Sequence, residues 1–205
     1  MNKKWKIISF LVTIILIFSC IFGILYKKAE KENNYNNRYE ELMSDPMEIE
    51  KKWLIDKDNI PYNLNNADIY AIEQTYLCLS PEMRVRKING GEDYTFTVKA
   101  NMSSDGLIRD EFEISITEKE YNDLLLKKEK DTITINKTRY QFLVEGEIFA
   151  IDIFENELKG LAYLEIEFAD ENEAKDFGDP SWIVKNVTSD KRYKNQSLAK
   201  YGIPE

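Results

Sequence analysis

Charged and apolar side chains alternate along many short segments of this chain, and a β-strand sorts such a pattern onto two faces. Side chains two positions apart lie on the same face of a strand. Glu48, Glu50 and Lys52 therefore share one face, while Ile49 and Trp53 share the other. The further charged positions of this kind are Arg84 and Arg86, Lys99, Arg109, Glu111 and Glu113, Lys137 and Arg139, Asp152, and Glu165 and Glu167. The chain thus predicts a sheet with one face that is almost wholly charged.

This charged face fits the inside of a closed barrel better than the surface of an open sheet. A solvated sheet face also alternates with a buried one, but it usually mixes charged residues with Ser, Thr, Asn and Gln. Here Arg, Lys, Glu and Asp fill nearly every such position, and acids and bases tend to occupy different strands. We therefore expect an α+β fold, mainly antiparallel β, with a charged lumen and an apolar outer face that packs under helices. Residues 47–205 suffice for a barrel of about eight strands.

Turn and capping signals divide this region into short elements. Asn89-Gly90-Gly91 and Glu145-Gly146 predict hairpin turns. Thr117, followed by Glu120, predicts the capping box of a helix. The expected strands are 47–55, 71–79, 83–89, 93–100, 108–116, 130–136, 138–145, 147–155 and 161–169, and the expected helices are 117–128, 170–177 and 194–201.

The N-terminal region has a different composition. Residues 7–26 form an apolar run without charges, of about the length that crosses a bilayer as a helix. We expect an uncleaved transmembrane anchor in residues 1–28, with a cleaved signal or a lipoprotein signal as alternatives. Residues 29–46 are polar and Asn-rich and predict a linker, and residues 47–205 form the remaining domain. The lysines in residues 3–6 favour a cytoplasmic N-terminus and hence a domain on the external side.

Composition restricts the chemistry that the domain can perform. The chain has no histidine, which excludes Ser-His-Asp and Cys-His catalysis and zinc sites built with imidazole. Any metal would be a hard cation held by oxygen atoms. The net charge of −9 does not suit non-specific nucleic-acid binding, so we expect no nucleic-acid partner. Cys20 lies in the apolar run, so we expect no structural disulfide with Cys78.

A charged lumen needs partners for its charges, because charges withdrawn from water are costly unless they are paired. The acids and bases could pair with one another in a purely structural barrel. Convergent carboxylates also suit divalent cations, and convergent Arg and Lys suit phosphate oxygens. A polyphosphate that carries a divalent metal would satisfy both groups at once.

Glu48-Ile49-Glu50-Lys51-Lys52 resembles the ExExK signature that opens CYTH domains, the triphosphate tunnel metalloenzymes. The later motifs follow in the family's order: Arg84-Val85-Arg86, Thr97-Val98-Lys99, Arg109 to Glu113, Lys137-Thr138-Arg139, Ile151 to Phe154 with Gly160-Leu161, Glu165-Ile166-Glu167, and a closing segment from Val187 to Leu198. ExExK alone is a weak signal in a chain rich in Lys and Glu. An ordered series over residues 47–202 is specific, and it covers the whole predicted domain.

The resemblance implies an eight-stranded antiparallel tunnel that hydrolyses a linear triphosphate and requires Mg²⁺ or Mn²⁺. The phosphate-binding residues would be Lys52, Arg84, Arg86, Lys99, Arg109, Lys137 and Arg139. The metal ligands would be Glu48, Glu50, Glu111, Glu113, Asp152, Glu165 and Glu167, with Lys52 and Glu50 as catalytic residues. For Glu111 and Glu113, a role as ion partners of the bases is equally open, and we expect Tyr193 to serve in packing.

The identity of the triphosphate is less constrained than its class. We favour inorganic tripolyphosphate, because the sequence offers no obvious aromatic site for stacking a base. The alternatives within the family are a nucleoside or thiamine triphosphatase, an adenylate cyclase, and a non-catalytic triphosphate-binding module at the membrane.

Overall fold

The computed structural model describes residues 3–43, 47–101 and 108–205, and the side chains of residues 3–20, 43, 100–101 and 108–109 fall outside this description. The strands are β1 (Met47–Leu54), β2 (Asp68–Leu79), β3 (Glu82–Ile88), β4 (Asp93–Asn101), β5 (Ile108–Ser115), β6 (Ile135–Val144), β7 (Glu147–Phe154), β8 (Ala162–Glu167) and the short β9 (Lys185–Asn186). The α-helices are α1 (Lys3–Met43), α2 (Glu118–Leu125), α3 (Glu171–Asp176) and α4 (Asn195–Tyr201).

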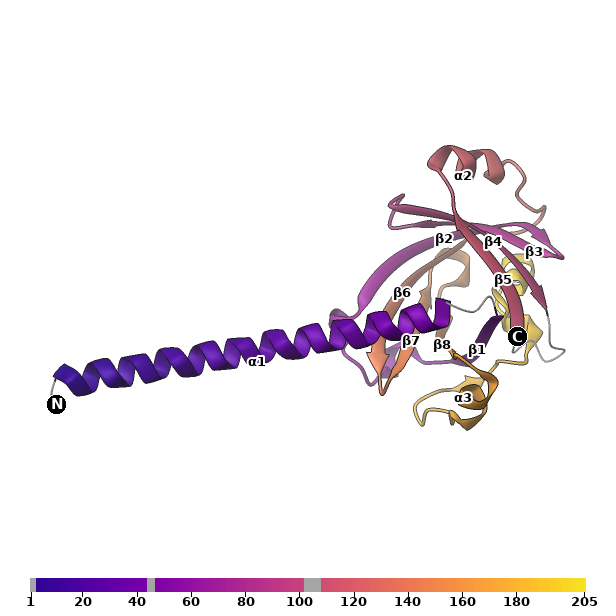
Figure 1. The fold of residues 1–205 in the computed structure, drawn as a ribbon. Coiled ribbons are helices and arrows are strands. Elements are labelled where there is room, and N and C mark those ends of the chain that lie inside the picture. Colours follow the sequence, from indigo (N-terminus) through magenta and orange to yellow (C-terminus); the bar gives the residue numbers. More distant parts are fainter. Residues whose placement is uncertain (1–2, 44–46, 102–107) are drawn as a thin grey trace.

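The strands β1 to β8 close into an antiparallel barrel (Figure 1). Neighbouring strands follow the order β5-β4-β3-β2-β6-β7-β8-β1, and β1 also pairs with β5, which completes the ring. In that closing pair Glu48 lies opposite Arg109. The strand β9 adds to the far end of β1, opposite Trp53 and Leu54. The predicted eight-stranded barrel with flanking helices is therefore confirmed.

The apolar side chains between the charged positions pack on the outside of the barrel wall. Ile49, Trp53 and Ile166 are at most 3% exposed and belong to one cluster that also includes Ala174 of α3. Trp53 contacts Phe177 at a ring distance of 5.9 Å. Burying an aliphatic side chain of this size contributes roughly 1.5–3 kcal/mol. The outer core thus fixes which face of each strand points inward.

A second helix covers the opposite part of the wall. The helix α2 packs against β2, β3 and β4, and its Tyr121 contacts Tyr94 at 5.0 Å. The predicted capping box is present: the Thr117 side chain accepts from the Glu120 backbone, and the Glu120 side chain accepts from the Thr117 backbone. The exit of β5 into α2 is therefore fixed by local hydrogen bonds.

The prediction of two separate strands at 130–136 and 138–145 is wrong, because a single strand, β6, runs from Ile135 to Val144. The preceding residues bond elsewhere: the backbone N–H of Glu129 donates to Tyr76, and that of Ile133 donates to Ala199 of α4. Asp131 has a φ of 55°, a left-handed conformation that interrupts a strand. Apolar alternation alone does not reveal such a break.

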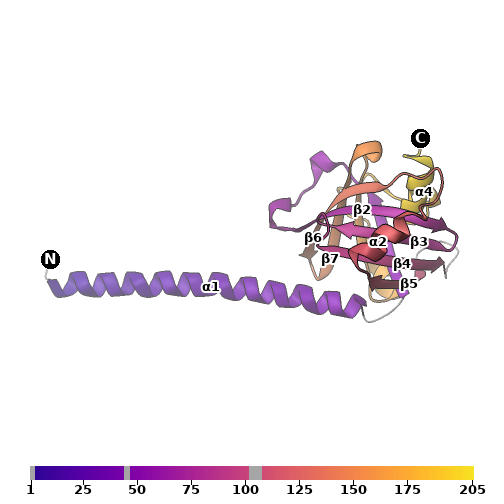
Figure 2. The same cartoon turned by 90° about the horizontal axis from the view of Figure 1, so that it is seen from above.

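The helix α1 is continuous from Lys3 to Met43, so the segment predicted as a linker is helical through Met43. Figures 1 and 2 show that only the C-terminal end of α1 lies beside the barrel. Within the part of the chain that the structure describes, no helix is long and apolar enough to cross a membrane. Most of the predicted anchor at 7–26 lies in residues whose side chains fall outside the description, so it gains no support here and stays a prediction.

Candidate active site

The barrel encloses a cavity of about 820 Å³. Its volume lies within the range of roughly 300–1,000 Å³ that is typical of ligand sites. The predicted site residues that line it are Glu48, Glu50, Lys52, Arg84, Arg86, Lys99, Glu111, Glu113, Lys137, Arg139, Glu165 and Glu167. The alternation of the strands has therefore brought residues from six strands to one space.

Two predicted site residues differ from this set. Asp152 is completely buried and is not among the residues that line the cavity. Its carboxylate accepts hydrogen bonds from Lys137 and from both Nε and Nη2 of Arg139. The side chain of Arg109 lies outside the described residues, although its backbone pairs with Glu48 on β1.

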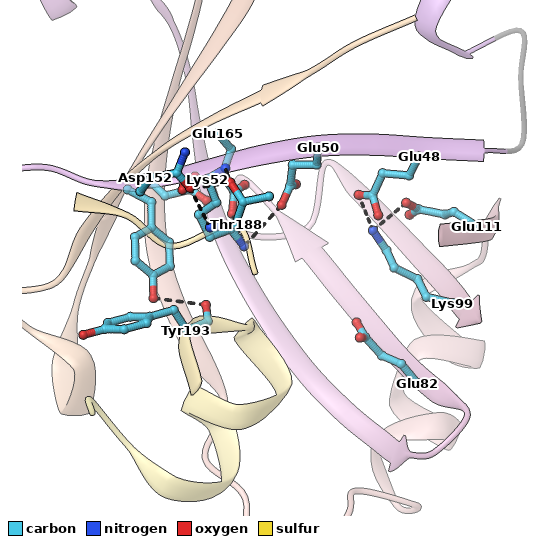
Figure 3. A network of polar contacts seen from close by, with 12 residues as sticks. Glu48, Glu50, Lys52, Glu82, Lys99, Glu111, Asp152, Glu165, Thr188 and Tyr193 are labelled. Carbon is cyan, nitrogen blue, oxygen red and sulfur yellow. Dashed lines mark hydrogen bonds and ion pairs between the residues drawn. The ribbon is translucent and has the colours of Figure 1, made fainter. Parts of the chain in front are cut away.

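One end of the charged network is neutralised by ion pairs. The Lys52 ammonium lies 2.8 Å from Glu165 and 3.3 Å from Glu50. Glu165 also accepts a hydrogen bond from Arg139, which in turn binds Asp152. The closing segment supports this group, because the Lys52 backbone N–H donates to the Thr188 hydroxyl at 3.0 Å (Figure 3).

The pairing in this network sets the protonation of its members. Burial alone would raise the pKa of Glu165, but Lys52, Lys137 and Arg139 hold that pKa well below its usual range. Burial opposes the charge of Lys52, yet Glu165 and Glu50 raise its pKa. Burial lowers the pKa of Lys137 to about 8, although Asp152 opposes this shift. Lys52 is therefore a permanent cation that cannot act as a general base near neutral pH.

The adjoining part of the lumen holds an excess of acids. Glu50 on β1 lies directly opposite Glu167 on β8, and like charges in that position repel one another. Lys99 bridges Glu48 and Glu111, as Figure 3 shows. Burial, followed by the charges of Glu48 and Glu50, raises the pKa of Glu167 to about 8. A carboxylate that retains a proton at neutral pH marks a place where a cation is missing from the charge balance.

This donor set suits a hard divalent cation. Carboxylate oxygens are the ligands that Mg²⁺ and Mn²⁺ prefer, and Glu167 lies close enough to Glu48 and Glu50 to be affected by their charges. Among the described residues, no three acidic side chains yet converge in the geometry of a metal site. Lysines instead pair with two of these carboxylates: Lys99 binds Glu48, and Lys52 lies against Glu50. Metal binding would require these lysines to give way.

The arginines of β3 differ in how well they are paired. Arg84 lies 3.2 Å from Glu82 and 3.5 Å from Glu111, and these acids raise its pKa against the effect of burial. Arg86 has weaker partners, donating to Gln74 at 3.3 Å and lying 3.8 Å from Glu113. Burial, followed by repulsion from Arg84, lowers the pKa of Arg86. An anion placed beside Arg86 would relieve both effects.

Sequence reasoning missed several residues that line the cavity or contact its arginines. Gln74 is fully buried and Glu82 is nearly so, and each contacts an arginine of β3. Gln74 was missed because it is uncharged, so charge alternation could not identify it. Tyr35 and Tyr39 of α1 also line the cavity. They lie in the segment predicted as a linker, and their sequence carries no signal that relates them to the barrel.

We expected Tyr193 to serve in packing. It contacts Tyr163, which lies beside Lys52, through its backbone carbonyl and its ring and not through its hydroxyl. Its backbone carbonyl accepts a hydrogen bond of 3.1 Å from Tyr163, and its ring lies edge-on to Tyr163 at 6.5 Å. Tyr163 lies in turn beneath the Lys52 ammonium, 5.3 Å from the ring centroid. Tyr193 therefore holds Tyr163 in place, and the Tyr163 ring packs against the Lys52 ammonium.

Comparisons with known proteins agree with this architecture. The model of the CYTH domain matches residues 46–199. An inorganic triphosphatase from Nitrosomonas europaea is 35% identical over 158 residues, which cover 74% of this chain and 96% of that protein. An inorganic triphosphatase from Acetivibrio thermocellus is 35% identical over 153 residues, which cover 75% of this chain and 93% of that protein.

A solved structure supports the same assignment. The crystal structure of an inorganic triphosphatase matches with a TM-score of 0.54 at 33% identity, and covers 77% of this chain and 97% of its own. On the family match, the identity to these relatives and the closed charged barrel, this chain belongs to the CYTH domain family.

Proposed function

We propose that this protein is a metal-dependent inorganic triphosphatase that cleaves a terminal phosphoanhydride bond of tripolyphosphate inside the barrel. The observation that carries this proposal is the unequal charge balance of the cavity. Arg86 is a half-buried cation with weak partners, and Glu167 is a half-buried acid that lies opposite Glu50. A triphosphate with a divalent cation supplies the missing charge at both places. The two curated relatives named inorganic triphosphatase support the choice of substrate.

The reaction adds one water to the terminal phosphorus and breaks its bond to the bridging oxygen, which gives phosphate and pyrophosphate and releases a proton to solvent. In this proposal Arg84, Arg86 and Arg139 bind phosphoryl oxygens and offset charge in the transition state. Lys99, Lys137 and Arg109 are assigned the same task from their motif positions. Lys52 stabilises the reacting phosphoryl group as a fixed cation, since its ion pairs keep it protonated.

The metal ligands that we propose are Glu48, Glu50 and Glu167, with Glu111 at the edge of the group. A bound Mg²⁺ or Mn²⁺ would neutralise phosphate charge and lower the pKa of a coordinated water. Glu50 then has two tasks, because it also lies against Lys52. We assign Asp152 and Glu165 to positioning Arg139 and Lys52, and Glu113 to positioning Arg86 and Thr97, rather than to the metal.

The test is phosphate release by the full-length protein from tripolyphosphate, ATP and thiamine triphosphate, with Mg²⁺ or Mn²⁺ and with EDTA. We expect metal-dependent release that is fastest from tripolyphosphate, and its loss in Glu50→Gln. The matched control is Glu118→Gln, which removes an exposed acid of α2. Tight binding of tripolyphosphate without cleavage would show that the protein is a triphosphate-binding module and not an enzyme. Faster cleavage of an organic triphosphate would change the substrate.

We also propose that residues 7–26 anchor the protein in a membrane, with the barrel on the external side. The uncharged apolar run and the lysines before it support this location. Full-length protein should then stay with membranes through salt and alkaline extraction. Release by alkali would show that residues 7–26 do not span the membrane. Protease protection of the barrel in intact cells would show that it lies on the cytoplasmic side.

A further inference from the structure

The last turns of α1 lie across one mouth of the cavity. Tyr35, Asn36, Tyr39 and Leu42 line it, and their spacing places them on one face of the helix. The preceding turns of α1 project away from the barrel (Figure 2). The CYTH match begins at residue 46. The covering of this mouth therefore comes from a part of the chain outside the family domain.

Arg38 fastens this segment to the rim of the barrel. Its guanidinium donates to Glu147, the first residue of β7, at 2.7 Å and to Glu173 of α3 at 2.6 Å. A third bond of 2.8 Å joins Arg38 to Glu41 within α1. Arg38 is only 9% exposed, and charge-assisted bonds of this kind are strong when they are shielded from water. The contact is thus a built attachment between α1 and two elements of the domain.

Tyr35 and Tyr39 lie on the face of α1 that lines the cavity. Their rings are stacked, 6.4 Å apart and inclined by 8°. Burial, followed by the charges of Glu113 and Glu167, raises the pKa of Tyr39. Burial, followed by Tyr70 and Asp68, raises the pKa of Tyr35. Both residues line the cavity together with the charged groups of the lumen, and Tyr39 is at the same time 45% exposed.

We propose that residues 35–42 form an end wall of the tunnel, and that Tyr35 and Tyr39 are specificity-determining residues that select a phosphate chain ending inside the cavity. The inference rests on the proposed triphosphatase function. A longer polyphosphate, or a triphosphate with an organic group at that end, would have to displace the docked helix. A chain of three phosphates ends before the wall and can accept hydrogen bonds from the phenols.

The experiment compares full-length wild type with Arg38→Glu and with Lys31→Glu, a matched charge reversal at an exposed position of the same helix. The measured quantity is kcat/KM for long-chain polyphosphate and for ATP, each divided by that for tripolyphosphate. We expect Arg38→Glu to raise this ratio about tenfold or more, because a displaced wall no longer excludes the longer ligand. Lys31→Glu should leave the ratio unchanged. Hydrogen exchange in residues 35–42 should rise in Arg38→Glu alone.

A second variant removes the wall without disturbing its attachment. Tyr39→Ala should shift the same ratio in the same direction, with normal exchange at Arg38. If exchange rises in Arg38→Glu while the ratio stays constant, the wall does not select substrate and the inference is wrong. An unchanged ratio in Tyr39→Ala contradicts it equally. If wild type releases no phosphate from tripolyphosphate at all, it is the proposed function that fails.

Discussion

Glu165 and Glu167 lie two positions apart on β8 and both line the cavity, yet their surroundings shift their pKa values in opposite directions. Glu165 faces Lys52, Lys137 and Arg139, which hold its pKa well below the usual range. Glu167 lies opposite Glu50, and burial with the neighbouring acids raises its pKa to about 8. The same residue type on the same face of one strand thus serves two purposes.

The difference separates a framework from a binding site. Around Glu165 the charges are already paired, so this network is complete without a ligand and holds Lys52 and Arg139 in place. Around Glu167 and Arg86 the charges are unbalanced, so a ligand can be bound there with a gain in electrostatic energy. Substitutions in the first region should therefore affect folding, and those in the second should affect ligands.

The largest effect is expected from Glu165→Gln. Removing this charge leaves Lys52 and Arg139 buried with one partner fewer, and breaking a buried pair in this way costs about 3–5 kcal/mol. Urea unfolding of the metal-free protein at pH 7 measures the loss. Glu171→Gln, at an exposed ion pair of α3, is the matched control and should cost less than about 1 kcal/mol. If Glu165→Gln lowers the free energy of unfolding by less than about 1 kcal/mol, Glu165 does not stabilise the fold in the way proposed.

A somewhat smaller effect is expected from Arg86→Ala, and it should appear in activity. Loss of one charge-assisted contact of about 2–3 kcal/mol corresponds to a decrease in kcat/KM of roughly 30- to 150-fold. Because its partners are weak, stability should change little. Lys119→Ala on α2 serves as the exposed control. Unaltered kcat/KM for tripolyphosphate would place the phosphates elsewhere in the lumen.

The third effect concerns pH and is expected in metal-free protein. Glu167 has a folded pKa of about 8, above its unfolded value. The folded state then binds a proton more tightly, so this contribution to stability is present at low pH and is lost as the pH rises from about 5 to 8. The slope is at most about 1.4 kcal/mol per pH unit. The difference between wild type and Glu167→Gln across this range isolates it from other groups, and a flat difference would refute the raised pKa.

Much of the barrel could be predicted from the sequence because its alternation is strict. Ile49 and Ile166 lie outside while Glu48 and Glu165 lie inside, as parity requires. The site as a set of charges followed from the same rule. The alternation of residues along a strand cannot predict which acids form ion pairs. Asp152 and Glu165 show the same alternation as Glu48 and Glu167, and only their neighbours in three dimensions distinguish the acids of the paired network from the acids beside Glu50.

Other features could not be predicted because they depend on contacts distant in sequence. Arg38 meets Glu147 and Glu173 only after the barrel has formed. The break before Ile135 likewise depends on hydrogen bonds to Tyr76 and to Ala199 of α4. Local pattern describes single elements well, and it says little about a helix that docks on the completed domain.

The smallest effect on stability is expected from Glu167→Gln at pH 4 without metal. At this pH Glu167 is mostly protonated in both the folded and the unfolded state, so a neutral amide replaces a neutral acid and stability should change by no more than about 0.5 kcal/mol. This small change should accompany a large loss of function, because the amide cannot supply a carboxylate to Mg²⁺ or Mn²⁺. Wild type must release its proton when metal binds, and calorimetry at pH 7 in buffers of different ionisation enthalpy should detect that proton. The variant should show weaker binding and no such release. If Glu167→Gln is instead as destabilising as Glu165→Gln and binds metal like wild type, the two acids have the same role and the contrast between framework and binding site is wrong.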